Sequence, residues 1–372
     1  MPHIDAEACL ISRSGSEDLA AGRRIAVLTE MDPWSPSTRY RALQYVPRLR
    51  DLLGTVDVSL PGDTLPRDPG RVGQVRYFSR HAARYVRRGL EVRRLGSRYD
   101  ALLVQRGLYP LGPGAIVHSL RGHQGPIVLD LDDALFPPPP SVQSKGTLGR
   151  WLYGPQQQLA LLRRADAVVV STEALAEMLP RGTPAPVILP TVPDPARYPL
   201  ARHGHERPVV VGWAGTVGGL DFLDPLSAVL DRLRRERAVE IEVVCSRPWR
   251  PWASFRRWRL EDEPALFLDF AIGIMPLPEH PYARAKAGFK LLQYMAAGLP
   301  VVASPVGVNR RLVEESQAGF LADAPDEWEE ALRELAGSPE LRARMGASGR
   351  AYVERYADLD AHAATLSRLL AG

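Results

Sequence analysis

Residues 270–305 read FAIGIMPLPEHPYARAKAGFKLLQYMAAGLPVVASP, and this stretch decides the fold class. An apolar run from Phe270 leads into a proline-rich loop and then into a helical pattern that ends at Gly298, after which Pro300 opens a second apolar run. Glycine after the last helical turn, with proline two residues later, is a typical helix stop. The order of strand, helix and buried strand indicates a parallel α/β sheet.

Outward from this stretch, apolar β-branched runs alternate with helical patterns along the chain. Strands are predicted in the first half at Arg24–Thr29, Thr55–Leu60, Asp100–Gln105, Pro126–Leu131, Ala167–Ser171 and Pro186–Leu189. Helices are predicted between them near Thr38–Leu53, Tyr77–Leu95, Gly114–His123, Gly149–Arg164 and Thr172–Leu179. Strands are predicted in the second half at Val209–Trp213, Val239–Cys245, Phe270–Met275, Pro300–Ala303 and Gly319–Leu321. Its predicted helices are Leu220–Glu236, Lys286–Ala297, Asn309–Glu315, Asp326–Leu335 and Glu340–Tyr356.

The two halves are separated by residues 190–208, which are dense in proline and lack an apolar period, and this segment is predicted to be a linker. A chain of 372 residues is long enough for two domains. We expect a flexible leader of residues 1–22, two doubly wound Rossmann-like domains of residues 23–189 and 209–350, and C-terminal helices in residues 351–372. Ligands bind at the carboxyl ends of strands between such lobes, so the domains are expected to face a cleft.

The composition excludes several classes of protein. With 45% hydrophobic and 24% charged residues, the chain is expected to be globular. Its longest apolar stretch, Ala265–Leu277, is too short to span a membrane. The two cysteines, Cys9 and Cys245, form neither a metal-binding spacing nor a disulfide framework, so we expect a cytoplasmic protein. The net charge of +4 is not accompanied by a basic motif interleaved with aromatic residues, and nucleic acid is therefore not an expected partner.

Lysine is rare in this chain, which uses arginine almost everywhere. Two of its three lysines, Lys286 and Lys290, lie in the helical pattern before Gly298. Together with Gln293 they are spaced i, i+4, i+7, which predicts that they share one helix face. Backbone N–H groups at a helix N-terminus and two ammonium groups favour a diphosphate, and Gln293 is suited to ribose hydroxyls. The alternative is an ordinary solvated helix face.

Residues 293–302 (QYMAAGLPVV) resemble the E-A-M-A-x-G-x-P-V-V motif of the family 4 (group 1) glycosyltransferases, which have the GT-B fold. The resemblance extends to residues 212–216 (GWAGT), residues 165–171 (ADAVVVS) and Leu189-Pro190, and so covers nearly the whole chain after residue 22. It implies two Rossmann-like domains facing a cleft and sugar transfer from a nucleotide diphosphate sugar with retention of anomeric configuration. It also implies that neither a metal nor another cofactor is needed.

The sequence departs from this family at two positions. The family commonly has two glutamates eight residues apart, whereas Ala285 and Gln293 stand there in this chain. Lys286 is expected to take over part of the role of the first glutamate near the sugar and the phosphates, which makes it a predicted catalytic residue. The loop with Gly215 and Thr216 follows a predicted strand and is expected to contact the diphosphate or the sugar; the alternative is a tight turn.

Polar residues at the carboxyl ends of first-half strands complete the predicted site. Asp132 and Asp133 are predicted to line the cleft, to act in catalysis and to bind acceptor hydroxyls, and the structural alternative is helix capping. A D-x-D pattern also holds Mg²⁺ in the GT-A architecture, but here it lies in the half that lacks the donor features. Arg39 or Arg41 is expected to reach the donor phosphates or an acidic acceptor; the alternative is a pair of solvent-exposed arginines.

The predicted helix Tyr77–Leu95 carries Arg80, Arg84, Arg87 and Arg88 along one side. A basic stripe of this kind is able to rest on anionic lipid. Peripheral contact with the inner face of a membrane is therefore one expectation, and a solvated helix face is the other.

These features predict a retaining glycosyltransferase that moves a sugar from a nucleotide diphosphate sugar to a hydroxyl of a carbohydrate, lipid-linked or small-molecule acceptor. Two alternatives stay open. A sugar-nucleotide 2-epimerase shares the two-lobed architecture but forms its product without an acceptor. A non-catalytic protein that binds a nucleotide sugar, or serves as a scaffold, binds the nucleotide without turnover.

Overall fold

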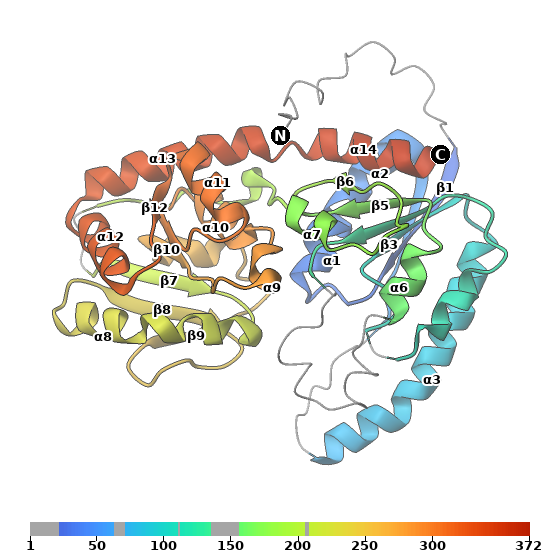
Figure 1. The fold of residues 1–372 in the computed structure, drawn as a ribbon, viewed down its shortest axis with the longest axis horizontal. Helices are drawn as coiled ribbons and strands as arrows, with labels where there is room; N and C mark the ends of the chain where they lie inside the picture. Colours follow the sequence, from blue (N-terminus) through green and yellow to red (C-terminus); the bar gives the residue numbers. More distant parts are fainter. Residues whose placement is uncertain (1–21, 63–70, 111, 135–155, 205–207) are drawn as a thin grey trace, which may run out of the picture.

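The computed structural model describes residues 22–62, 71–110, 112–134, 156–204 and 208–372, with side chains from residue 80 onward in the helix that begins at residue 71. Two lobes lie side by side, and each is built on one six-stranded sheet with helices packed against it (Figure 1). The predicted leader lies outside the described residues except for Gly22. The prediction of two Rossmann-like α/β domains is confirmed.

The first sheet has the strand order β2-β1-β3-β4-β5-β6, and all neighbouring strands are parallel. Its strands are β1 (Arg23–Thr29), β2 (Gly54–Ser59), β3 (Ala101–Gln105), β4 (Ile127–Leu131), β5 (Ala167–Val170) and β6 (Val187–Ile188). All six lie where the sequence predicts them. The reason is burial, since every residue of β3 and β4 is buried, and strands covered on both faces read as continuous apolar runs.

The second sheet has the strand order β12-β11-β10-β7-β8-β9, again with parallel neighbours. Its strands are β7 (Val210–Ala214), β8 (Glu240–Cys245), β9 (Ser254–Arg257), β10 (Ile272–Met275), β11 (Val301–Ala303) and β12 (Gly319–Leu321). Five of them confirm the prediction. The sequence does not predict β9, because this edge strand reads SFRR and carries no apolar run.

In each sheet, the strand that comes first in the chain (β1 or β7) has earlier strands added on one side of it and later strands on the other. The point between the two sets is the topological switch point. The switch lies between β1 and β3 in the first sheet and between β7 and β10 in the second. In open parallel sheets, ligands bind at the carboxyl ends of the strands beside such a point. Residues that follow β1, β3, β4, β7, β8 and β10 line one pocket, so the two switch points meet at the same place.

The helix predicted at Thr38–Leu53 is broken in the structure. It consists of α1 (Pro36–Arg41), a 3-10 turn η2 (Leu43–Tyr45) and α2 (Val46–Leu53). Pro47 has no backbone N–H and cannot continue the hydrogen bonds of the preceding turn, which explains why the chain restarts there. Three further helices of the first lobe are η3 (Gly114–Leu120), α6 (Gln156–Leu162) and α7 (Glu173–Glu177). Residues 149–155 of a predicted helix lie outside the described residues.

Helix α3 (Arg71–Gly96) runs along the outer edge of the first lobe (Figure 1). The predicted stripe of four arginines is wrong at Arg88, which is 2% exposed and whose Nε donates to the Leu108 carbonyl at 3.0 Å. Arg80 and Arg87 remain exposed, so the basic surface is narrower than predicted. None of the helices in the described ranges is long and apolar enough to cross a membrane.

The second lobe contains eight shorter helices and turns in its described part. They are η5 (Val217–Phe222), η6 (Asp224–Leu226), α8 (Ser227–Arg235), η7 (Ala265–Asp269), α9 (Pro281–Arg284), α10 (Phe289–Ala296), α11 (Val308–Ser316) and α12 (Pro325–Gly337). The helix predicted at Lys286–Ala297 therefore begins three residues later than expected. Buried aliphatic and aromatic side chains of α10 fasten it to the sheet; Leu291, Tyr294 and Met295 are completely inaccessible to solvent.

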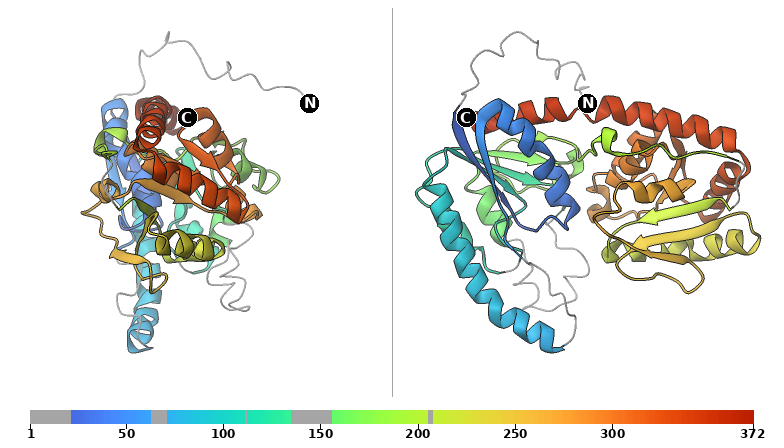
Figure 2. Two further views of the ribbon diagram at one scale, coloured as in Figure 1. Left: turned by 90° about the vertical axis from the view of Figure 1, so that its left-hand side faces the viewer. Right: turned by 180° about the vertical axis from the view of Figure 1, so that it is seen from behind.

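The chain crosses between the lobes twice. The first crossing is the predicted linker, which contains the short turn η4 (Pro195–Arg197). The second lies between α13 (Pro339–Tyr356), which packs against α10, and α14 (Leu359–Ala371), which packs against α2 and the first sheet (Figures 1 and 2). The predicted boundary at residue 350 falls inside α13, and the last helix belongs to the first lobe.

Candidate functional site

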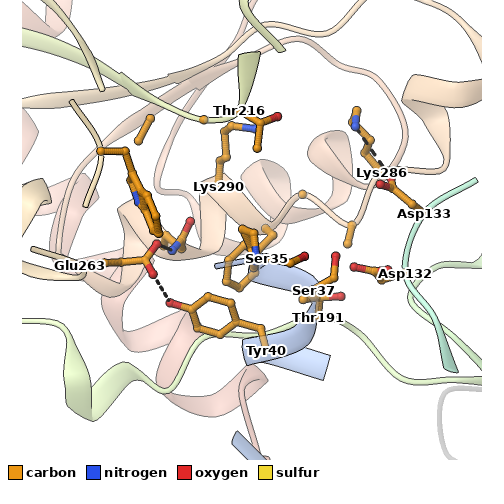
Figure 3. Close-up of a pocket in the computed structure, with 18 of the residues that line it drawn as sticks. Ser35, Ser37, Tyr40, Asp132, Asp133, Thr191, Thr216, Glu263, Lys286 and Lys290 are labelled. Carbon is orange, nitrogen blue, oxygen red and sulfur yellow. Dashed lines mark hydrogen bonds and ion pairs between the residues drawn. The ribbon is translucent and has the colours of Figure 1, made fainter. Parts of the chain in front are cut away.

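A pocket of about 590 Å³ opens between the lobes, a volume typical of small-molecule sites (Figure 3). First-lobe residues that line it include Ser35, Ser37, Tyr40, Arg106, Asp132 and Asp133. Second-lobe residues that line it include Gly215, Thr216, Trp258, Glu263, Lys286, Lys290 and Gln293. The pocket therefore brings together all predicted donor-binding and catalytic residues, whereas the two predicted arginines do not line it.

Helix α10 positions the second-lobe side of the pocket. Its N-cap is Gly288, whose φ of +63° is a left-handed conformation that glycine adopts without strain. A Cβ at this position would also lie 2.6 Å from the Leu312 side chain. Because the helix starts only after Gly288, Lys286 lies in the preceding loop. The prediction that Lys286 shares a helix face with Lys290 and Gln293 is therefore wrong.

Lys290 lies in the first turn of α10, and its ammonium is 5.5 Å from the centroid of the Trp213 ring. No carboxylate of the described residues forms an ion pair with it. Burial, followed by repulsion from Lys286, lowers the pKa of Lys290 to about 8. A half-buried cation that has no ion pair among the described residues and lies beside a helix N-terminus favours an anionic ligand.

Lys286 joins the two lobes. Its Nζ is 3.9 Å from Asp133 Oδ1 and 4.5 Å from the centroid of the Tyr282 ring. Burial acts to lower the pKa of Lys286, but the Asp133 carboxylate and then the Tyr282 hydroxyl outweigh it, so the pKa lies above its ordinary value. Lys286 is therefore a cation at neutral pH that faces both the pocket and a first-lobe carboxylate.

The glycine-rich loop after β7 lies against Lys290. The Gly215 N–H donates to the Val244 carbonyl at 3.0 Å, so this N–H is not available to a phosphate. Gly215 instead supplies space, because a Cβ there would lie 2.6 Å from the Trp213 ring and 2.8 Å from Lys290 Cε. The Thr216 side chain lies beside Lys290 at the pocket wall (Figure 3).

Gly215→Ala is expected to push the Lys290 side chain out of place and to weaken binding of a nucleoside diphosphate about tenfold, since 1.4 kcal/mol of lost interaction corresponds to that factor. The matched control is Gly218→Ala in the adjacent 3-10 helix η5, where a Cβ would meet nothing within 4 Å. Calorimetric titration of both variants measures the effect. Equal affinities in the two variants would contradict the spatial role of Gly215.

Arg106 organises the first-lobe side of the pocket. Its Nη1 lies 3.6 Å from Asp132 Oδ1 and 3.5 Å from Asp133 Oδ2, and its Nε lies 3.1 Å from Glu30 Oε2. Its φ of +63° is uncommon for a residue other than glycine, and such residues cluster at functional sites. Asp132 Oδ1 is buried and has no hydrogen-bond donor among the described residues, so its capacity to accept a hydrogen bond is unused beside the Arg106 ion pair.

Gln293 lies beside a carboxylate from a distant part of the chain. Its Nε2 donates to the Tyr198 hydroxyl at 2.9 Å and is 3.3 Å from Glu263 Oε1. Glu263 Oε2 accepts hydrogen bonds from Arg39 Nη2 at 2.7 Å and from the Tyr40 hydroxyl at 3.2 Å. Position 293 itself is neutral, but a negative charge is present next to it.

Arg39 and Arg41 are not the accessible cations that the sequence predicts. Arg41 is fully buried, and its Nε donates to Asp130 Oδ1 at 3.0 Å. Arg39 is 9% exposed and forms an ion pair with Glu263 across the lobe boundary. Both guanidinium groups are paired with protein carboxylates, so neither is free to bind the sugar donor or the acceptor. The alternative of solvent-exposed arginines is wrong as well.

Three pocket residues, Arg106, Trp258 and Glu263, were not found by sequence reasoning. Arg106 stands directly after a buried parallel strand, a position at which functional residues are common. Trp258 and Glu263 follow the polar strand β9, where neither a motif nor an apolar period marks them. Within the described ranges, no group of three or more His, Cys, Asp or Glu residues is placed to hold a metal ion.

Most of the second lobe is similar to a known protein family. Residues 210–338 match the family model "Glycosyl transferases group 1". A search of curated protein sequences found no match.

The similarity to solved structures extends over both lobes. Alr3699/HepE from Anabaena, solved with UDP and glucose, has a TM-score of 0.67 and 15% identity over 94% of this chain and 100% of that one. WaaG, described as a glycosyltransferase involved in lipopolysaccharide biosynthesis, has a TM-score of 0.57 and 15% identity over 94% of this chain and 99% of its own. TarM from S. aureus has a TM-score of 0.54 and 13% identity, and the match spans 73% of this chain and about half, 55%, of TarM.

The match to the family model and the structural likeness have different extents. The family model covers all six strands of the second sheet and both lysines of the pocket. The likeness to solved structures is at low identity and concerns the fold of both lobes. The second lobe thus matches the group 1 glycosyltransferases, and the chain as a whole has the GT-B fold of glycosyltransferases.

Proposed function

We propose that this protein transfers a sugar from a nucleotide diphosphate sugar to a hydroxyl of a carbohydrate, lipid-linked or small-molecule acceptor. The observation that carries the proposal is the unpaired Lys290 ammonium, which shares one pocket with the first-lobe carboxylates Asp132 and Asp133. A diphosphate would pair with Lys290, and an acceptor hydroxyl would supply the hydrogen-bond donor that Asp132 Oδ1 lacks. The family match of the second lobe and the UDP bound in HepE support the same donor class.

The proposed reaction retains the anomeric configuration. The bond between the anomeric carbon and the phosphate oxygen breaks, the acceptor oxygen bonds to that carbon on the same face, and the hydroxyl proton passes to the departing diphosphate. Retention requires the group at the leaving phosphate and the group at the acceptor to act on the same face of the sugar, and we assign these roles to Lys286 and Asp133, whose Nζ and Oδ1 atoms are 3.9 Å apart. The positive charges of Lys286 and Lys290 stabilise the departing diphosphate, so the proposed reaction needs no metal ion.

Thermal unfolding in the presence of UDP-, GDP- and dTDP-sugars, with EDTA added, tests this proposal. We expect one nucleotide to stabilise the protein, since a ligand at 100 times its Kd contributes about 2.7 kcal/mol. Lys290→Met is expected to lose this stabilisation, and Arg310→Ala, on the exposed surface of α11, is expected to keep it. Absence of stabilisation by every nucleotide in a folded sample would overturn the proposal.

Turnover with the stabilising donor separates the proposed function from the two alternatives. Transfer to an acceptor with an unchanged anomeric configuration, read by NMR of the product, supports the retaining transferase. A new sugar nucleotide formed without any acceptor would indicate a 2-epimerase. Nucleotide binding without turnover over a broad acceptor panel would indicate a binding or scaffold protein.

A further inference from the structure

The charged groups follow an order along the pocket. In Figure 3, Glu263 lies at one end, Lys290 in the middle, and Lys286 with Asp133 at the other end. A nucleotide sugar is itself linear, with the nucleoside, the diphosphate and the sugar in sequence. With the diphosphate at Lys290 and the sugar near the first-lobe carboxylates, the nucleoside lies at the Glu263 end.

The two oxygens of the Glu263 carboxylate have different surroundings. Oε2 accepts hydrogen bonds from Arg39 and Tyr40, which belong to the first lobe and fix its orientation. Oε1 is in contact with the Gln293 amide alone among the described polar groups, at 3.3 Å. A carboxylate oxygen accepts about two hydrogen bonds, so Oε1 has capacity for a further donor from the pocket.

Aromatic rings surround the same end of the pocket. The Arg39 guanidinium lies 5.3 Å from the centroid of the Trp258 ring, and the Trp258 and Trp34 rings are 6.1 Å apart. Trp34, Trp258 and Phe267 all line the pocket. Flat apolar walls favour a planar base, and the adjacent Glu263 carboxylate favours hydroxyl donors. A nucleoside with a vicinal diol offers both.

We propose that Glu263 accepts hydrogen bonds from the ribose hydroxyls of the donor, with Gln293 beside it, and so selects ribonucleotide donors over deoxyribonucleotide donors. The inference rests on the proposed function and narrows its donor to a UDP- or GDP-sugar rather than a dTDP-sugar. A deoxyribose would leave the Glu263 oxygen buried without its donor, which weakens binding. Since Arg39 and Tyr40 hold Glu263 from the first lobe, the same contact ties the nucleoside to both lobes.

Calorimetric titration of the full chain with UDP and GDP, and with their 2′-deoxy and 3′-deoxy forms, tests this selectivity. The wild type is expected to bind the ribonucleotide at least about tenfold more tightly than either deoxy form. In Glu263→Gln this ratio is expected to fall to within about threefold. Asp262→Asn is the matched control, because it removes one charge from the neighbouring exposed side chain outside the pocket, and it should keep the ratio.

The ratio distinguishes recognition of ribose from a purely structural contact. If Glu263 only links the lobes, Glu263→Gln weakens both nucleotide types equally and the ratio stays, which overturns the inference. A wild type that binds both types equally also overturns it and leaves the transferase function standing, whereas failure to bind any nucleoside diphosphate overturns both. Glu263→Asp keeps the charge but shortens its reach, so loss of the ratio in this variant supports the inference even where Glu263→Gln does not fold.

Discussion

Lys290→Met is expected to raise the Kd for the donor's nucleoside diphosphate roughly 100-fold, or about 3 kcal/mol, because it removes one partner of a buried charge pair in the complex. The same substitution is expected to stabilise the unliganded protein by about 1 kcal/mol, since a half-buried ammonium without a counter-ion costs folding free energy. Methionine keeps the aliphatic stem over the Trp213 ring. A substitution that stabilises the fold but weakens ligand binding indicates that the residue serves binding rather than stability.

The pH dependence of both quantities follows from the pKa of Lys290, which burial lowers from its model-compound value of 10.5 to about 8. Below pH 8 the lysine is charged in the folded and the unfolded chain, and the folded protein carries the cost of burial. Between pH 8 and 10.5 the unfolded chain binds more protons, so the stability of the free protein rises with pH. Affinity for the diphosphate changes with pH in the opposite direction. Above pH 8, Lys290 must take up a proton when the diphosphate binds, so the Kd rises by up to about tenfold per pH unit.

Titration calorimetry from pH 7 to 9.5, with urea unfolding at the same pH values, measures both effects. Lys290→Arg is the control, because a guanidinium stays charged throughout this range and removes the rise in Kd. A Lys290→Met protein that loses stability and affinity together would show that Lys290 serves the fold, and the anion site would have to lie elsewhere in the pocket.

The fold was predictable because buried parallel strands leave a clear pattern in the sequence. Their side chains are covered on both faces, so each strand is an apolar run that sequence reading detects, and glycine or proline marks its end. The errors fall where single residues override a pattern. Pro47 divides the first helix, and Gly288 delays the start of α10 and so moves Lys286 off the helix. The edge strand β9 has only one hydrophobic side chain, Phe255, which is exposed, and leaves no signal.

The site was predictable only where a local motif carries it. Lys290 and Gln293 lie on one helix, and Gly215 directly follows strand β7. Short-range spacing is therefore enough to identify them as site residues. What spacing does not reveal is which side chains pair over long distances. Arg41 binds a carboxylate 89 residues away and Arg39 one 224 residues away, and these pairings remove both arginines from the pocket. Such partners are set by the tertiary fold, and local sequence does not encode them.

Arg41→Met is expected to destabilise the protein by about 3–5 kcal/mol, because it leaves a buried carboxylate without its counter-ion. The side chains of Arg41 and Asp130 are 0% and 2% exposed, and the guanidinium also donates to the Leu189 carbonyl, which begins the passage toward the linker. The double variant Arg41→Met/Asp130→Leu is expected to recover much of the loss, since it removes both charges. Arg48→Met breaks the exposed pair with Asp360 and is expected to cost at most about 1 kcal/mol.

The pH dependence of this loss identifies the carboxylate as its cause. Burial raises the pKa of Asp130, and Arg41 opposes that rise. Without Arg41 the folded protein holds the Asp130 proton to a still higher pH, whereas the unfolded chain releases it near its ordinary pKa of about 3.9. The folded state then binds more protons than the unfolded state across this window, so the penalty is smallest at low pH and grows as pH rises toward neutrality. Urea unfolding midpoints of the single and double variants at pH 4 and 7 measure it. If the Arg41→Met protein were as stable as the wild type at pH 7 but bound nucleotide weakly, Arg41 would instead have to be assigned to the donor site.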